Sequence, residues 1–207
     1  MQLICVRHGR TAWNAIRRFQ GQTDVPLDAE GRAQAQALAA YLGTEHFDFA
    51  VASDLSRAFE TARGIGLAAG VTIEPEPRLR EMHFGAWEGL VWDEILARNP
   101  GIAHEYEKSV KYMVPEGGES FEDVCARVAP VLHEIAARLG PQGRALIVSH
   151  AGVMHAIAHV ALAKPDDAAL GIKFVPGAIM RLEGDGTIPW TRASLNETAP
   201  PVEATAN

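Results

Sequence analysis

The chain has 207 residues, 47% of them hydrophobic and 22% charged, and its formal net charge is −7. This balance is typical of a globular protein with a sizeable core, and it excludes a general nucleic-acid binder, which needs a basic surface. The two cysteines are too few for a disulfide framework, and no stretch is long and apolar enough to cross a membrane. We therefore expect a cytoplasmic protein that binds neither nucleic acid nor membrane.

Short apolar runs alternate with helical patterns along most of the chain. In chain order, strands are predicted over residues 2–6, 47–52, 71–74, 145–148, 179–182 and 188–192, with a Gly184-Asp-Gly turn between the last two. Helices are predicted over 29–41, from Ser53 or Asp54 towards Gly70, and over 90–98, 121–139 and 153–163. This alternation predicts an α/β fold, a three-layer sandwich with helices on both faces of a mostly parallel central sheet.

One domain is expected over residues 1–195. The polar and aromatic segment 99–118 interrupts the alternation, and we interpret it as a small lid insertion. Residues 196–207 are rich in Pro, Ala, Thr and Glu, which predicts a loose C-terminal tail.

Two histidines and two arginines follow the predicted strands. Arg7 and His8 come directly after the first strand, Arg57 lies one turn into the helix after the second, and His150 follows the strand 145–148. Ligands of open α/β sheets bind beyond the carboxyl ends of the strands, so these side chains are expected at one edge. Two guanidinium groups can hold the oxygens of a dianionic phosphate, and the amides that open the helix after His150 add donors. The sequence therefore predicts a phosphate site.

Five segments in order resemble the signature of the histidine phosphatase (phosphoglycerate mutase-like) superfamily. They begin with the Arg-His-Gly triplet at residues 7–9 and reach a Ser-His-Ala-Gly segment at 149–152. One departure is Arg10, because the family commonly has Glu after the triplet; it adds positive charge near the pocket mouth and leaves the substrate preference open. The matching segments are 3–27, 53–62, 79–89, 115–120 and 148–152.

The resemblance implies a mechanism. His8 would attack phosphorus as a neutral imidazole whose other ring nitrogen donates to a backbone carbonyl, which gives a phosphohistidine. Arg7, Arg57 and His150 would hold the phosphoryl oxygens. Glu81 would protonate the leaving alkoxide and then help a water molecule to attack. Glu88 is the competitor for the acid, and we interpret it instead as the partner of a surface cation.

Further residues of these segments are expected to bind substrate, and no cofactor or metal is expected. His155 and His159 lie four residues apart on one helical face, a spacing that can bind zinc, but no carboxylate completes the pattern. The expected substrate-binding residues are Asn14, Gln20, Gly21, His83 and Gly152.

The expected activity is that of a cytoplasmic phosphomonoesterase which hydrolyses a small phosphorylated metabolite. The segment around Glu81 resembles the phosphatase branch of the family, and residues 99–118 contain only Lys108 and Lys111 as cations, which is little for a second anion site. A phosphoglycerate mutase is the alternative, and a catalytically silent module that binds phosphorylated ligands is the second alternative. Many relatives form dimers, so a homodimer stays open beside the monomer.

Overall fold

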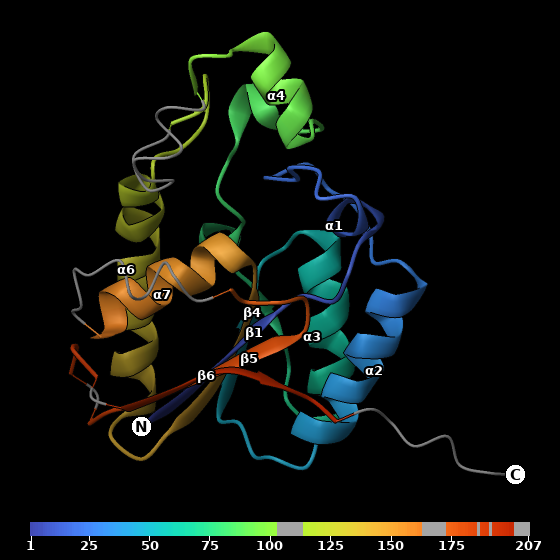
Figure 1. The fold of residues 1–207 in the computed structure, drawn as a ribbon. Coiled ribbons are helices and arrows are strands. Elements are labelled where there is room, and N and C mark those ends of the chain that lie inside the picture. The colour runs from blue at the N-terminus through green and yellow to red at the C-terminus, as the bar shows by residue number, and fades with distance from the viewer. Residues whose placement is uncertain (103–113, 163–172, 186, 191, 201–207) are drawn as a thin grey trace, which may run out of the picture.

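A six-stranded sheet forms the centre of the computed structural model, which describes residues 1–102, 114–162, 173–185, 187–190 and 192–200. The strand order is β3-β2-β4-β1-β5-β6 (Figure 1). β1 and β4 pair in parallel, as do β4 with β2 and β2 with β3, whereas β5 is antiparallel to β1 and to β6. The strands are β1 (Gln2–Arg7), β2 (Phe49–Ala52), β3 (Glu74–Pro75), β4 (Arg144–Ser149), β5 (Ala178–Glu183) and β6 (Arg192–Thr198).

Helices cover both faces of this sheet (Figure 1). α2 (Ala29–Leu42) and α3 (Ser56–Ala69) lie on one face, and α6 (Phe121–Leu139) and α7 (Ala151–Leu162) lie on the other. Because side chains alternate along a strand, β1 sends Ile4 and Val6 into the core under α2 and α3, and Leu3 and Cys5 into the core under α6 and α7. Burial on both faces explains why β1 and β4 read as continuous apolar runs. The predicted three-layer α/β sandwich is confirmed.

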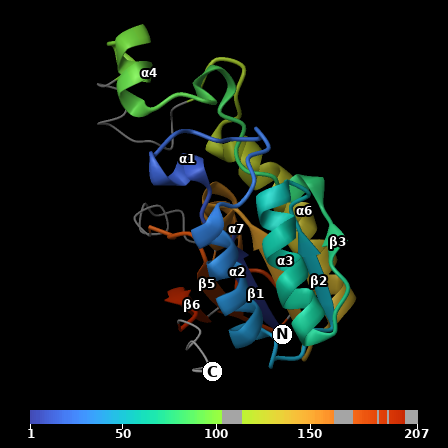
Figure 2. The ribbon, with the colours of Figure 1, turned by 90° about the vertical axis from the view of Figure 1, so that its right-hand side faces the viewer.

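A smaller group of elements stands beyond the carboxyl ends of the parallel strands, and Figure 2 shows α4 at its tip. Its short elements are α1 (Ala12–Ala15), the 3₁₀ turns η1 (Pro77–Leu79) and η2 (Gly85–Trp87), and α4 (Trp92–Arg98). Ile95 and Ile102 form a separate apolar cluster here with Phe19 and Trp87. The predicted lid, 99–118, is described only at its two ends, since residues 103–113 lie outside the described part of the chain. It stays a prediction.

Three predicted boundaries were wrong. The third strand is Glu74–Pro75 and not 71–74, because the N–H of Val71 binds the carbonyl of Gly66 and completes the end of α3. The last strand begins at Arg192 and not at 188, because the N–H of Trp190 binds Ala161 O at 2.6 Å and holds the preceding residues on α7. β6 continues to Thr198, so it occupies the start of the tail expected from residue 196; residues 201–207 lie outside the described part.

The N-cap of α3 also differs from the prediction. Leu55 occupies this position and makes no side-chain cap. The two polar residues before it have other partners: the Asp54 carboxylate pairs with Arg80, and the Ser53 hydroxyl faces His150. Within the described residues, no helix combines the length and the hydropathy needed to span a membrane.

Candidate active site

The pairing of β1 with β4 brings His8 and His150 together. Arg7 and Ser149, the last residues of the two strands, are partners in the parallel register, and the N–H of His8 donates to Ser149 O at 2.9 Å. Each histidine follows its strand by one residue, so both imidazoles leave the sheet at the same edge. The ring centroids are 5.0 Å apart, the planes meet at 60°, and both side chains are buried.

His8 is held as a neutral imidazole of defined tautomer. Its Nδ1 lies 2.6 Å from the carbonyl of Gly9, which can only accept, so Nδ1 carries the proton. Burial lowers the pKa of His8 well below its ordinary value, and the charges of Arg57 and Arg7 lower it further. The remaining nitrogen, Nε2, therefore has a free lone pair at neutral pH, as a nucleophile needs.

His150 has the complementary arrangement. Its Nε2 lies 2.8 Å from Ser53 Oγ, and the same hydroxyl accepts from the N–H of Leu55 at 3.3 Å. Burial lowers the pKa of His150 well below its ordinary value, with a further contribution from Arg57. We infer that the hydroxyl of Ser53 donates to Nε2, which leaves the proton of the neutral ring on Nδ1. The sequence placed Ser53 at a strand end but gave no sign of this role.

The guanidinium groups of the buried Arg57 and the partly buried Arg7 complete the base of the site. Arg57 donates to the carbonyls of Gly21 at 2.8 Å and Thr23 at 2.9 Å, and Arg7 donates to the carbonyl of Phe174. Burial lowers the pKa of both arginines, and the charge of Glu81 opposes that shift. Arg7 Nε, Arg57 Nε and His150 Nδ1 are buried and have no hydrogen-bond partner among the described residues. Three such donors near His8 fit the oxygens of a phosphoryl group.

Glu81 is buried beside this group. Its Oε1 accepts from the N–H of Met82 at 2.9 Å and from that of Gly152 at 3.1 Å. A Cβ on Gly152 would come within 2.5 Å of the same oxygen, so the close approach requires glycine. The amide of Gly152 thus donates to this carboxylate, and the expected contact of Gly152 with substrate stays a prediction.

Arg127 holds the segment that carries Glu81, and sequence reasoning missed it. This side chain donates to the carbonyls of Arg78 at 2.6 Å and Glu81 at 3.1 Å, and its Nε pairs with Glu119 at 2.8 Å. Glu119 also accepts from the N–H of His83 at 2.8 Å. The sequence contained one signal for this pair: Glu119 in the segment 115–120 lies eight residues before Arg127, which belongs to the amphipathic helix α6.

Glu88 joins two loops, and among the described residues the expected pairing with a surface cation is found only with His83, whose Nε2 lies 3.6 Å from its carboxylate. Its carboxylate accepts from the N–H groups of Gln22 at 2.9 Å, Thr23 at 3.0 Å and Phe84 at 3.1 Å. The first two belong to the loop whose carbonyls receive Arg57. Gly21 in this loop has a φ of 52°, and a Cβ there would come within 2.0 Å of Glu88 Oε1, which explains the glycine.

The other predicted residues divide into two groups. Asn14 and Gln20 line a hollow together with Arg7 and Glu81, and each also binds Thr11. His83 does not line that hollow, because its Nδ1 faces Gly117 O at 2.9 Å and its Nε2 lies 3.6 Å from Glu88. This placement argues against the predicted substrate contact of His83.

The candidate zinc histidines pack against aromatic rings. His155 lies 5.0 Å from the ring of Phe174, and His159 lies 5.6 Å from that of Phe121. In the described part of the chain, no three His, Cys, Asp or Glu side chains are close enough together to hold a metal ion.

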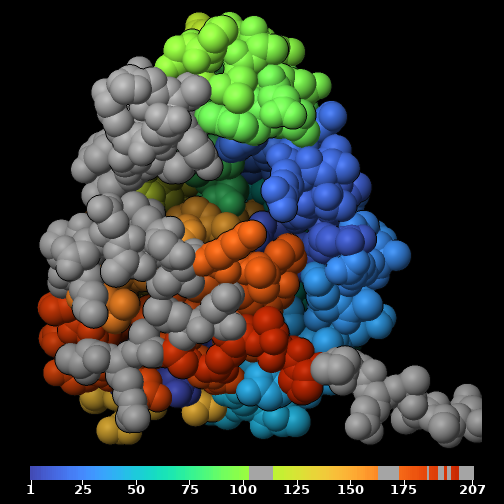
Figure 3. All heavy atoms as spheres, viewed as in Figure 1, coloured from blue at the N-terminus to red at the C-terminus, as the bar shows by residue number. Residues whose placement is uncertain are grey.

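The hollow over the site has a volume of about 560 Å³ and is basic. In Figure 3 the surface is hollowed between the blue region that contains α1 and the orange segment that starts at Lys173. Glu81 is its one acidic lining residue among those described, and Phe19, Phe84 and Phe174 give it apolar walls. Its cationic lining residues are Arg7, Arg10, Arg17, Arg18 and Lys173.

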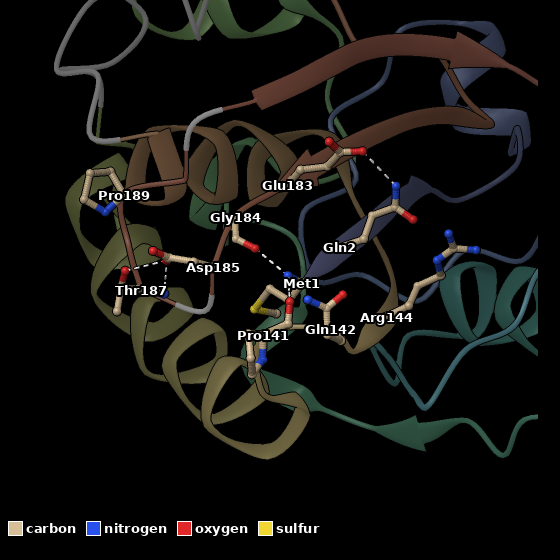
Figure 4. A pocket seen from close by; sticks show the side chains of 10 residues that line it. All are labelled: Met1, Gln2, Pro141, Gln142, Arg144, Glu183, Gly184, Asp185, Thr187 and Pro189. Carbon is tan, nitrogen blue, oxygen red and sulfur yellow. Dashed lines mark hydrogen bonds between the residues drawn. The ribbon is translucent and has the colours of Figure 1, made fainter.

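A second hollow, of about 630 Å³, lies at the opposite end of the sheet around the amino end of β1 (Figure 4). Most of its polar groups bind one another. Gln2 donates to Glu183 at 3.0 Å, Thr187 donates to Asp185 at 2.6 Å, and the amino group of Met1 donates to the carbonyls of Pro141 and Gly184. No histidine or cysteine is among its described lining residues.

Known proteins resemble this chain in sequence and in fold. The model of the histidine phosphatase superfamily (branch 1) matches residues 3–197. A glucosyl-3-phosphoglycerate phosphatase of Mycobacterium tuberculosis is 37% identical over 171 residues, which are 79% of this chain and 76% of that protein. A probable phosphoglycerate mutase GpmB of an Enterobacter strain is 33% identical over 190 residues, which are 92% of this chain and 87% of that protein. The solved structure of mycobacterial glucosyl-3-phosphoglycerate phosphatase in complex with VO3 superposes with a TM-score of 0.86 at 33% identity, and covers 95% of this chain and 98% of that one.

Proposed function

The chain belongs to the histidine phosphatase superfamily, as the sequence predicted, and from this premise we propose how its residues hydrolyse a phosphate monoester. The chain is a phosphomonoesterase of a small phosphorylated metabolite that acts through a phosphohistidine. The observation that carries the assignment of roles is the neutral His8, with Nδ1 bound to Gly9 O and Nε2 free, beside three buried donors without a described partner.

In the first step, His8 Nε2 attacks phosphorus and the bond from phosphorus to the ester oxygen breaks. The leaving oxygen takes a proton from Glu81 and departs as an alcohol. Arg7, Arg57 and the Nδ1–H of His150 hold the other phosphoryl oxygens and offset the charge that develops on them.

In the second step, a water molecule gives a proton to Glu81 and attacks phosphorus. The bond from phosphorus to Nε2 breaks, inorganic phosphate leaves, and His8 returns to its neutral form while Glu81 is protonated again. The hydrogen bonds that Glu81 accepts from Met82 and Gly152 fix the carboxyl group in place for both transfers.

Asn14 and Gln20 are proposed to contact the substrate, because both line the hollow that Arg7 and Glu81 also line. The proposal includes a cytoplasmic location, action without a metal or other cofactor, and no binding of nucleic acid or membrane; the net charge of −7 supports the exclusion of nucleic acid. Whether two copies form a homodimer is a separate prediction, which sedimentation velocity would test.

A panel of phosphorylated metabolites tests the activity, and the relatives make phosphorylated glycerates the first compounds to include. We expect release of inorganic phosphate, and a labelled phosphoryl group on His8 when the reaction is quenched early in alkali. Formation of 2-phosphoglycerate from 3-phosphoglycerate with little free phosphate would instead identify a mutase. Binding of these compounds without turnover would identify a silent binding module.

A further inference from the structure

Arg17 has a backbone conformation that is unusual for its residue type. Among the described residues it is the only one besides glycine with a positive φ, at 55°. The N–H of Arg18 binds Trp13 O at 2.9 Å and that of Arg17 binds Asn14 O at 3.2 Å, a Schellman motif that closes α1 and puts Arg17 at its left-handed position. Glycine is the usual residue there, because a side chain makes this conformation unfavourable. A strained arginine on the wall of the hollow suggests a function for its charge.

The hollow contains more positive charge than a phosphoryl group requires. The buried donors of Arg7, Arg57 and His150 already serve the phosphoryl group. Arg10 is paired with Asp28 at 2.8 Å, whereas the ion pairs of the described residues include neither Arg17, Arg18 nor Lys173.

Arg18 is held in place by its neighbours. Its guanidinium carbon lies 5.7 Å from the centre of the Trp13 ring, and its Nε is buried without a described partner. A positioned guanidinium with an unused donor is the type of group that recognises a carboxylate.

We propose that Arg17, Arg18 and Lys173 form a second anion-binding subsite, which selects phosphate monoesters that carry a carboxylate near the ester. The inference rests on the proposed function for the position of the phosphoryl group. The proposed subsite lies in a different part of the chain from the one considered in the sequence analysis. The sequence analysis considered the cations of residues 99–118, whereas the cations proposed here are Arg17 and Arg18, which follow α1, and Lys173.

Two substrates separate selection of a carboxylate from general attraction of anions. 3-Phosphoglycerate and glycerol 3-phosphate share the carbon skeleton and the phosphate ester, and differ in a carboxylate against a hydroxymethyl group. We expect the wild-type chain to show a kcat/KM about 10-fold or more higher for 3-phosphoglycerate, the effect of one hydrogen bond to a charged group.

Arg17→Gly is the informative variant, because glycine suits the left-handed position and keeps the fold. It should lower kcat/KM for 3-phosphoglycerate about 10-fold, mainly by raising KM, and change that for glycerol 3-phosphate less than about 2-fold. Arg63→Gln on α3, which does not line the hollow, removes the same charge as a matched control and should leave both substrates unaffected.

If Arg17→Gly lowered kcat/KM equally for the two substrates, the proposed subsite would be overturned, because the charge of Arg17 would then attract any anion and would not select the carboxylate. A wild-type chain that prefers glycerol 3-phosphate would overturn it as well. Calorimetry can measure the dissociation constants of the same two compounds for His8→Ala and for the double variant with Arg17→Gly. Because His8→Ala lacks the nucleophile, this comparison tests the subsite without turnover. If no substrate is hydrolysed but this binding difference holds, the proposed function fails and the subsite stands.

Discussion

The two ends of the sheet carry hollows of similar volume, about 560 Å³ at the carboxyl end of β1 and about 630 Å³ at its amino end. At the amino end, Gln2 binds Glu183 and Thr187 binds Asp185, and among the described lining residues the one buried side-chain atom without a partner is an acceptor, Gln2 Oε1. At the carboxyl end, buried nitrogen atoms of Arg7, Arg57 and His150 have no described partner. Volume therefore does not distinguish the two places, whereas the concentration of unpartnered buried donors does, because such donors cost free energy until an acceptor binds them.

The largest expected difference between the two ends comes from removal of the nucleophile. His8→Ala should lower kcat by at least about 10³-fold, because the other buried imidazole, His150, turns its protonated Nδ1 to the phosphoryl group and has its Nε2 bound to Ser53, so it offers no lone pair for the attack. Steady-state phosphate release measures this effect, and circular dichroism checks that the variant is folded. Near wild-type turnover would show that the chemistry takes place elsewhere.

A smaller loss is expected when the acid is removed. Glu81→Gln keeps the shape of the side chain and should lower kcat about 10²- to 10³-fold for an alkyl phosphate. The first step should be much less affected for p-nitrophenyl phosphate, whose leaving group needs no proton. Burst kinetics with the two substrates compare the steps, and equal losses in the first step would contradict the assignment of Glu81 as the acid.

The buried histidines should make stability depend on pH. Their pKa values are lowered in the folded chain, so below pH about 6.5 the unfolded chain binds protons that the folded chain does not, and stability falls as the pH falls. The limiting slope is about 1.4 kcal/mol per pH unit for each histidine. Urea unfolding between pH 5 and about 7 measures it. His8→Asn should reduce the slope, and a slope unchanged in this variant would contradict a folded His8 that stays neutral in this range.

The smallest effect is expected at the amino end. Thr187→Ala removes one exposed hydrogen bond to Asp185, so it should lower the free energy of unfolding by less than about 1 kcal/mol and leave kcat unchanged. A large loss of turnover in this variant would remove the contrast between the two hollows and reopen the amino end as a functional site.

Sequence reasoning identified the parts of the molecule that depend on local pattern. The apolar strands and the residues directly after them, Arg7, His8 and His150, could be predicted because the end of a parallel strand fixes where the next side chain lies. Contacts between distant loops could not be predicted. Arg127 binds carbonyls of the Glu81 segment, and Glu88 binds amides of the Arg57 loop, and no periodicity indicates a hydrogen bond from a side chain to a distant backbone group.

Arg57 links two events that are usually considered separately. Its Nη atoms donate to the carbonyls of Gly21 and Thr23, while its Nε is buried without a described partner and is a donor proposed for phosphate. The proposal therefore couples the ligand to the loop, and the coupling is reciprocal: a bound oxyanion should protect the loop from hydrogen exchange, and whatever loosens the loop should weaken the binding of the oxyanion.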